Sequence, residues 1–438
     1  MQPLTSPYIP NTEAERAELL RAVGARSVDD LFHDIPEGHR NPPLEMPAPL
    51  SEMELRAELQ RLSEKNFHAG KHPSFLGAGV YHHYTPAAIA PLVLRGEFLT
   101  SYTPYQPEVS QGTLQGTFEF QTMTAQLLGM EVANAGMYDG GTALAEAALM
   151  ACRVTKRYKV AVVDTVNPHY VEAIRTYASP QGIDVYAIPA GATSLQADTA
   201  CVVAQYPNFL GYVEDVRALA DLAHGAGALL CTANDPVAMA LFRSPGSFGV
   251  DIATAEAQAL GVPPSFGGPF VGMFACKSEY VRQMPGRIAG RTTDAQGRSG
   301  YVLTLQPREQ HIRRERATSN ICTSTALIAL WSTIYVALMG KRGLRHVAEL
   351  CYQKAHYAAS EIAKLPGYRL PVGGTFFQEF VVSCPRPPAE VSLAMEEAGI
   401  IGGYDVSDRV PNGLLLCVTE VNTKAQIDKL VSVLGGLR

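Results

Sequence analysis

The chain has 438 residues and a formal net charge of −6, with 47% hydrophobic and 18% charged residues. This length and composition exclude a disordered chain and favour more than one packed domain. The mild acidity argues against nucleic-acid binding, and the lack of a long uncharged apolar run argues against a membrane span or a signal peptide. We therefore expect a cytoplasmic α/β protein with no nucleic-acid or membrane partner.

Residues 1–74 are predicted to form an N-terminal helical arm. Thr12 with Glu15 and Ser51 with Glu54 both match the capping-box spacing that begins a helix. The Pro-rich connector between the two helices is incompatible with a helix or a central strand. Because the arm has too little apolar content for a core of its own, we expect it to wrap a neighbouring surface.

Residues 75–320 are predicted to form a large α/β domain, because short apolar strands alternate with helices. The predicted strands cover 131–136, 159–164, 200–206, 228–233, 251–257 and 271–277. The intervening predicted helices cover 140–155, 168–178 and 215–227. This alternation is typical of βαβ units and predicts a mostly parallel sheet with helices on both faces.

Residues 321–438 are predicted to form a small C-terminal α+β domain on a helical spine. The predicted helices cover 325–340, 344–365, 388–399 and 423–436, and the predicted strands cover 376–383 and 414–420.

No metal site is predicted, and none of the common catalytic or nucleotide-binding motifs is present. The eight cysteines are scattered through apolar segments, without the close Cys/His spacing of a metal centre. We interpret them as buried, reduced thiols.

Two polar turns are candidate anion sites. Gly140, Gly141 and Thr142 lie between a strand and a helix, where glycine N–H groups and a hydroxyl favour a phosphate. A simple glycine turn with a threonine cap explains the same residues. The other candidate turn consists of Thr318, Ser319 and Asn320, for which helix capping is an equally good explanation.

Two loops rich in aromatic residues are candidate binding or interface surfaces. Their residues are Tyr81, His82 and His83 in the first loop, and Tyr102, Tyr105 and Gln106 in the second. Clustered Tyr and Pro outside strands are unusual for simple linkers. An ordinary structural role for these loops stays open.

The order of arm, large domain, helical spine and small domain resembles the fold-type-I pyridoxal-phosphate enzymes. Five stretches carry a closer resemblance, namely FLGAGVYHHYTPAAI, FLTSYTPYQPEVSQGTLQGTFEFQTM, YDGGTALAEA, PSFGGPFVG and RRERATSNICTSTAL. Together they resemble the P-protein family of the glycine cleavage system, and within it the subunit 1 chains of glycine dehydrogenase (decarboxylating).

The resemblance implies that this chain lacks the covalent anchor of the cofactor. Gln258 aligns with the lysine that forms the Schiff base in the family's cofactor-bearing subunit, and a glutamine amide cannot form that bond. The Asp that would pair with the cofactor ring has no clear counterpart, since Asp235 is displaced and is followed by Pro. Gly140, Gly141 and Thr142 would then be a vestigial phosphate loop.

The resemblance also implies partners. Pyridoxal 5'-phosphate would be bound by glycine dehydrogenase subunit 2, in an α2β2 complex that decarboxylates glycine and passes the aminomethyl group to the lipoyl group of H-protein. Thr318, Ser319 and Asn320 would reach the partner's cofactor phosphate. The loops at 81–83 and 102–106 would line the path of glycine or the lipoyl group.

Two alternatives stay open at this point. One is a self-sufficient pyridoxal-phosphate enzyme that uses Lys277, the single lysine between Lys159 and Lys341. The other is a purely structural scaffold subunit whose pocket touches no cofactor.

Overall fold

The computed structural model describes residues 11–40, 42–43, 45–306, 310–321 and 323–437. It divides into two compact units, Met1–Asn66 and Phe67–Arg438. The predicted domain boundaries after residues 74 and 320 stay predictions. Among the helices of the described residues, none combines the length and the apolar character needed to cross a membrane.

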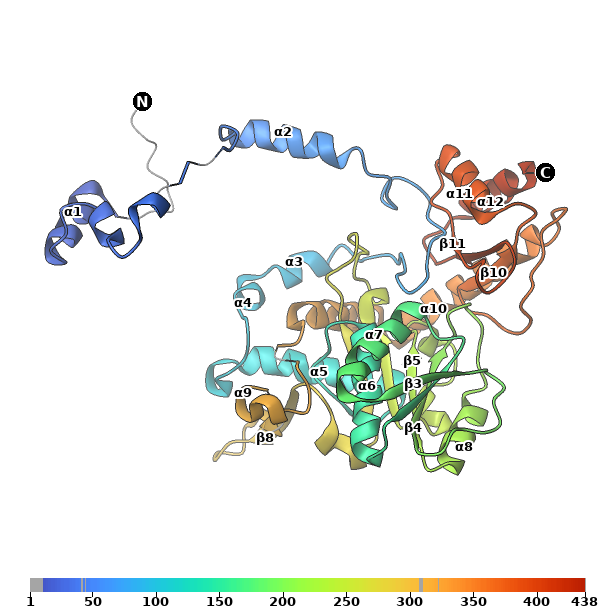
Figure 1. Cartoon of the computed structure of the whole chain (residues 1–438). Helices are drawn as coiled ribbons and strands as arrows, with labels where there is room; N and C mark the ends of the chain where they lie inside the picture. The colour runs from blue at the N-terminus through green and yellow to red at the C-terminus, as the bar shows by residue number, and fades with distance from the viewer. Residues whose placement is uncertain (1–10, 41, 44, 307–309, 322, 438) are drawn as a thin grey trace. The chain divides into compact units, whose positions relative to one another are not determined.

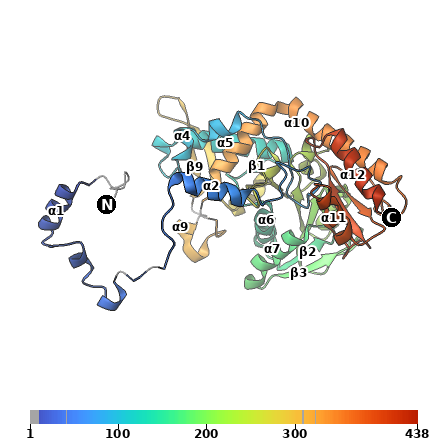
Figure 2. The ribbon, with the colours of Figure 1, turned by 90° about the horizontal axis from the view of Figure 1, so that it is seen from above.

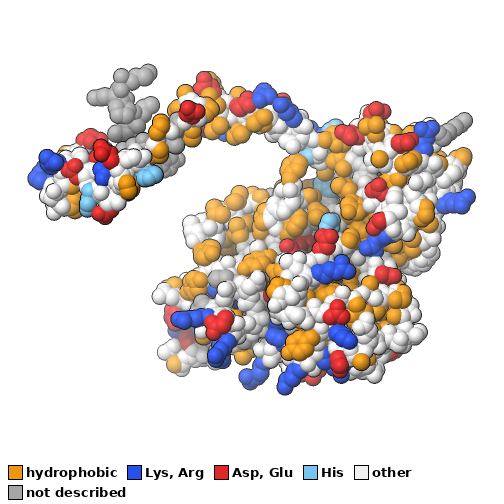
Figure 3. Space-filling model, viewed as in Figure 1, with side chains coloured by type: hydrophobic (Ala, Val, Ile, Leu, Met, Phe, Trp, Pro, Cys, Tyr) orange, Lys and Arg blue, Asp and Glu red, His pale blue; other side chains and the backbone are white. Residues whose placement is uncertain are grey.

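The first unit contains helices α1 (Glu13–Ala22) and α2 (Glu52–Ser63), and neither buries a single residue. Both begin with the predicted capping boxes, in which the Ser or Thr hydroxyl and the Glu carboxylate satisfy each other's backbone N–H groups. Apolar side chains therefore remain at the surface of this unit (Figure 3). On the two helices the large exposed apolar side chains are Leu19 of α1 and Met53, Leu55, Leu59 and Leu62 of α2.

The second unit is built on a seven-stranded sheet with the order β1-β7-β6-β5-β4-β2-β3 (Figure 1). Its strands are β1 (Val132–Ala133), β2 (Lys159–Val163), β3 (Asp184–Ile188), β4 (Thr199–Tyr206), β5 (Leu229–Asn234), β6 (Ile252–Glu256) and β7 (Gly272–Cys276). Strands β2 to β6 run parallel, whereas β7 is antiparallel to both of its neighbours. Because almost every residue of the central strands is buried, both faces of the sheet are covered. The predicted fold class is confirmed.

Helices cover the sheet, and the Ala-rich helix α6 packs against β4, β5, β6 and β7. The helices that belong to this part are α3 (Ile89–Val93), α4 (Gly96–Leu99), α5 (Gln111–Leu128), α6 (Gly140–Thr155), α7 (Pro168–Ala178), α8 (Val216–Gly225) and α9 (Gln310–Arg313). Small side chains on α6 let its axis approach the sheet closely, which is why nearly the whole helix is buried.

A second antiparallel sheet, of order β10-β12-β11, forms the C-terminal part. Its elements are β10 (Glu379–Ser383), β11 (Tyr404–Asp405), β12 (Gly413–Cys417), α11 (Pro388–Glu397) and α12 (Lys424–Gly436). An antiparallel hairpin of β8 (Ile288–Thr293) and β9 (Ser299–Thr304), which the sequence pattern did not predict, stands apart from both sheets.

Helix α10 (Ala326–Ile362) joins the two parts and is broken at Gly340, whose φ is 59°. This break agrees with the two predicted spine helices. The N-terminal half of α10 lies in the core of the large sheet, and its C-terminal half lies in the core of the C-terminal sheet. Figure 2 shows α10 running past α12 toward α5, both of which it contacts.

Replacing Leu144 by Ala tests the packing of α6. Leu144 is fully buried, so the substitution removes apolar contacts and leaves a cavity, and the free energy of unfolding should fall by about 2–5 kcal/mol. Leu338→Ala, at a position that is 49% exposed, is the control and should change it by less than about 0.5 kcal/mol. Urea unfolding followed by circular dichroism measures both, and equal effects would contradict the buried position of α6.

Candidate functional site

The candidate site lies where the parallel strands of the large sheet end. This carboxyl edge is where open α/β sheets bind their ligands. A narrow cavity of about 30 Å³ lies there, with room for one or two water molecules. The polar side chains that line it are Tyr81, Tyr170, Gln205, Asn208, Asn234, Asp235, Glu256, Gln378 and Glu379.

Gln258 follows β6 and is fully buried. Its Oε1 accepts a hydrogen bond from the Tyr81 N–H at 2.8 Å, and its Nε2 donates to the carbonyl oxygens of Tyr81 at 2.8 Å and Val262 at 2.7 Å. The side-chain amide therefore clamps the loop around Tyr81 to the loop after β6. Such an amide has no nucleophilic amine with which to bind a carbonyl cofactor.

Glu256, the last residue of β6, occupies the N-terminus of α6. Its Oε2 accepts from the Gly140 N–H at 2.7 Å, and its Oε1 accepts from the Gln258 N–H at 2.9 Å. Asp139 caps the same helix by accepting from the Thr142 N–H at 2.7 Å. Two carboxyl groups of the chain thus accept from the N–H groups at the start of α6 that a phosphate would need. Burial raises the pKa of Glu256 to about 8.

Gly140 and Gly141 of the predicted vestigial phosphate loop are needed for packing. A Cβ on Gly140 would lie 2.9 Å from both the Glu256 Cβ and the Tyr170 hydroxyl oxygen, and one on Gly141 would lie 3.2 Å from the Tyr170 ring. Because the two glycines lack a Cβ, the first turn of α6 packs directly against the Glu256 and Tyr170 side chains. A role in phosphate binding stays a prediction.

Glu379, the first residue of β10, is a second buried carboxyl group at the cavity. Its Oε1 accepts from the Ala78 N–H at 2.6 Å and its Oε2 accepts from the Tyr81 hydroxyl at 2.7 Å. The carboxyl group lies so close to the backbone that a Cβ on Gly77 would be 2.3 Å from Oε1. Burial raises the pKa of Glu379 to about 7, and the charge of Asp235 adds to this effect.

Asp235 follows β5, but its carboxylate is bound to groups of this chain. Oδ1 accepts from the backbone N–H groups of Val237 at 2.8 Å and Ala238 at 3.1 Å, and Oδ2 accepts from the Gln378 Nε2 at 2.8 Å. Burial raises the pKa of Asp235. Its oxygens are therefore satisfied without a cofactor ring.

A second, more open cavity of about 290 Å³ lies beside the start of α6. Thr142, Asn167, His169, Tyr170 and Glu256 are among its lining residues. Asn167 caps α7 by accepting from the His169 N–H at 3.0 Å, and the His169 side chain is 68% exposed. This cavity therefore presents an imidazole, a hydroxyl and a carboxyl group, but no lysine among its lining residues.

The predicted path-lining residues fall into two differently exposed groups. His83 is buried and its Nδ1 lies 2.7 Å from the Glu420 Oε2, whereas Tyr81 lines the narrow cavity. Tyr102 and Tyr105 are 79% and 57% exposed. Of the remaining two, His82 is half-buried and Gln106 is exposed. Their role in lining a path stays a prediction.

The predicted anion turn at 318–320 contacts α6. The Ser319 hydroxyl donates to the Glu146 Oε1 at 2.5 Å, and its oxygen accepts from the Ile321 N–H at 3.1 Å. Thr318 is half-buried and Asn320 is exposed. The Ser319 hydroxyl is therefore already used within the chain, and the turn caps no helix of the described residues, since α10 begins at Ala326. Phosphate binding by this turn stays a prediction.

Lys277 lies at the opposite edge of the sheet. It follows β7, which runs antiparallel to β6, so the end of β7 meets the start of β6. Its Nζ forms a salt bridge with Asp251, the residue before β6. Lys277 is therefore separated from the narrow cavity by the length of a strand.

Sequence reasoning missed two of the carboxyl groups that fill the site. Glu256 ends an otherwise mostly apolar strand two residues before Gln258, and Glu379 lies in the apolar stretch that forms β10. A charged residue inside a buried strand is rare unless its charge is compensated. A charged residue within a predicted buried strand is therefore the sequence feature that would have identified both Glu256 and Glu379.

Comparison with known proteins agrees with this geometry. The family model described as "Glycine cleavage system P-protein" matches residues 6–434. The chain belongs to the P-protein family of the glycine cleavage system. A protein of Thermomicrobium roseum is 48% identical over 441 residues, and one of Geobacillus kaustophilus is 49% identical over 441 residues. Each alignment covers 98% of both chains, and each relative is named probable glycine dehydrogenase (decarboxylating) subunit 1.

Solved structures confirm the predicted fold class and the predicted enzyme family. A crystal structure of glycine decarboxylase (P-protein) in an inhibitor-bound form matches with a TM-score of 0.94 and 44% identity, covering 99% of this chain and 100% of that one. A sphingosine-1-phosphate lyase of Burkholderia pseudomallei matches with a TM-score of 0.63 at 18% identity, over 92% of this chain and 94% of that one. This second likeness shows the fold alone, which is that of the fold-type-I pyridoxal-phosphate enzymes.

Replacing Glu379 by Gln tests its raised pKa. The folded protein holds the Glu379 proton more tightly than the unfolded chain, so stability from this group is lost as the pH rises from about 4.5 to about 7. The amide is neutral throughout and keeps an acceptor for Ala78 and a donor for Tyr81. Between pH 5 and pH 8 the wild type should therefore lose about 2–3 kcal/mol more stability than Glu379→Gln. Urea unfolding at both pH values measures this, and parallel pH profiles would contradict it.

Proposed function

We propose that this chain is the subunit of a heteromeric glycine decarboxylase that does not carry the cofactor. In this proposal glycine dehydrogenase subunit 2 binds pyridoxal phosphate, the complex is α2β2, and the aminomethyl group of glycine passes to lipoyl H-protein. The observation that carries the proposal is the internal filling of the chain's own site. The predicted cytoplasmic location is part of the same proposal.

Pyridoxal phosphate does not fit the groups at this site. Both N–H donors of the buried Gln258 amide are taken by main-chain carbonyl oxygens, and its oxygen accepts from a main-chain N–H group, so the amide offers no donor to a cofactor. The Glu256 carboxyl group already accepts from the α6 N-terminus. A dianionic phosphate there would be next to a carboxyl group instead of an unpaired N–H group. We therefore assign the cofactor chemistry to the partner subunit.

The contribution of this chain would be to bind the partner and to shape access to its site. The helices of the first unit expose their apolar side chains, as an element does when its core contacts come from another subunit. Tyr102 and Tyr105 present large exposed aromatic surfaces, and the Tyr105 ring stacks against Arg287, whose guanidinium carbon lies 5.2 Å from the ring centroid. Exposed aromatic side chains next to Arg are typical of interface cores.

The two alternatives are disfavoured to different degrees. A cofactor bound at Lys277 would have to sit at the far edge of the sheet, where the ammonium group is already paired with Asp251. A purely structural scaffold remains compatible with the filled cavity. It differs from our proposal in requiring no effect of the turn at 318–320 on the cofactor.

Borohydride reduction of the assembled complex tests where the cofactor is bound. We expect mass spectrometry to find the reduced cofactor on the partner subunit and not on this chain. The variant Gln258→Lys should remain unlabelled, because the new amine faces the main-chain carbonyl oxygens of Tyr81 and Val262 instead of a cofactor. Gln258→Met is the control for loss of the clamp. Label on Lys277, or on the introduced amine, would overturn the assignment.

Thr318→Ala in this chain tests the predicted reach of the turn into the partner's site. Loss of a hydrogen bond to a charged phosphate typically costs about 1.5–3 kcal/mol, so the complex should bind pyridoxal phosphate about 10- to 150-fold more weakly. Thr176→Ala, at an exposed position on α7, is the matched control. Equilibrium dialysis with absorbance detection measures both variants. Unchanged affinity in Thr318→Ala would favour the scaffold alternative.

A further inference from the structure

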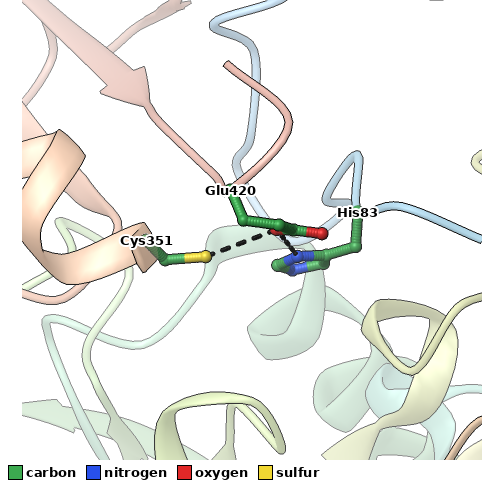
Figure 4. Close-up of side chains that lie close together, drawn as sticks. All are labelled: His83, Cys351 and Glu420. Carbon is green, nitrogen blue, oxygen red and sulfur yellow. Dashed lines mark hydrogen bonds and ion pairs between the residues drawn. The ribbon is translucent and has the colours of Figure 1, made fainter. Parts of the chain in front are cut away.

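Three residues with metal-binding side chains meet beside the loop that Gln258 clamps. His83 belongs to that loop, Cys351 to α10, and Glu420 to the segment after β12 (Figure 4). The His83 Nδ1 lies 2.7 Å from the Glu420 Oε2, and the Cys351 Sγ lies 3.5 Å from the same oxygen. The three donor atoms all lie within 4.8 Å of one another. We propose that His83, Cys351 and Glu420 form a structural zinc site.

The cluster is closed to solvent. The side chains of His83 and Glu420 are 1% and 9% exposed, and Cys351 is fully buried. A buried set of imidazole, thiol and carboxylate is the ligand combination that Zn²⁺ prefers, at roughly 2.0–2.3 Å from each ligand atom. Tetrahedral ligand atoms are then roughly 3.3–3.8 Å apart, so the His83–Glu420 contact needs to widen by less than about 1 Å.

The charge of a zinc ion would be balanced by the charges of its three ligands. Zinc bound by a thiolate, a carboxylate and a neutral imidazole leaves no net charge in the buried cluster. The nearby Lys354 ammonium group donates to the Glu420 main-chain carbonyl oxygen and not to its carboxylate. Among the residues that the structure describes, His83 and Cys351 are the hydrogen-bond partners of the Glu420 Oε2.

A supporting shell of hydrogen bonds orients two of the ligands. The Glu420 Oε1 accepts from the Tyr84 N–H at 2.7 Å, which presents Oε2 as a single ligand atom. The Thr419 hydroxyl donates to the His82 carbonyl oxygen at 2.6 Å and so ties the segment before Glu420 to the residue before His83. Such outer contacts are a regular part of metal sites in proteins.

Two buried polar atoms near the cluster point to a missing species. The His83 Nε2 and the Tyr335 hydroxyl have no hydrogen-bond partner among the residues that the structure describes. Tyr335 lies on α10. Burial raises the pKa of its hydroxyl, and the nearby charges of Glu420 and Cys351 add to this effect. Unpartnered buried groups are costly, and a water molecule as the fourth zinc ligand would give the Tyr335 hydroxyl a partner.

The expected consequence of zinc is a fixed loop. The metal would join the loop that contains Tyr81 and His82 to α10 and to the end of β12, at the junction of the two hydrophobic cores. No local sequence motif identifies the site, because His83 and Glu420 are 337 residues apart and Cys351 and Glu420 are 69 residues apart. This separation explains why the sequence predicted no metal site.

Metal analysis of the purified full-length chain tests the proposal. After chelator treatment, reloading with zinc chloride and gel filtration, we expect about one zinc ion per chain. Loading with cobalt chloride instead should give the near-ultraviolet charge-transfer band of a cobalt–thiolate bond. Wild-type protein that retains no zinc after reloading would overturn the proposal without any variant.

Two variants and one control locate the ligands. Cys351→Ser and Glu420→Gln should each weaken zinc binding at least about 100-fold, and Cys351→Ser should lose the cobalt band. Cys384→Ser replaces another buried cysteine outside the cluster and should keep both the zinc and the band. If Cys351→Ser retains zinc and the band while Cys384→Ser loses them, the metal binds elsewhere and the assignment is wrong.

Discussion

The amide of Gln258 is the contact on which the candidate site depends. Its three hydrogen bonds hold the Tyr81 loop against the loop that follows β6, inside a region closed to water. A buried main-chain N–H or carbonyl group without a partner destabilises the folded state, so these two loops need a side chain that both donates and accepts. Glutamine meets that need, and a lysine in the same place would donate only.

The remaining polar groups of the carboxyl edge follow the same principle. In a cofactor-binding site, helix N-termini and strand ends are left with unpaired donors that the ligand satisfies. Here Glu256 accepts from the start of α6, Glu379 accepts from the Tyr81 loop, and Asp235 accepts from its own turn. The chain thus supplies internal carboxyl groups to the donors at this edge. Burial of these carboxyl groups raises their pKa values, which is the electrostatic consequence of filling the site with acids.

Much of the architecture could be predicted because it depends on local rules. Capping boxes at Thr12 and Ser51 identify helix starts from residues three positions apart. The apolar strands from 159 to 277 and the Ala-rich helix at 140–155 identify a parallel sheet with helices on both faces. The hairpin at 288–304 was missed because its strands are partly exposed and lack a continuous apolar run.

The sequence by itself determined the fold class and the family, because each depends on residue types in a fixed order along the chain. That Gln258 stands in place of the anchoring lysine stays a prediction from the resemblance. Only the tertiary structure decided what Gln258 and its neighbours do. Gln258 meets Tyr81 across 177 residues, Tyr81 meets Glu379 across 298, and His83 meets Glu420 across 337. Contacts of this range arise only when the strands pair and α10 joins the two cores. Burial and hydrogen-bond partners, and with them charge and ligand geometry, are therefore properties of the folded chain.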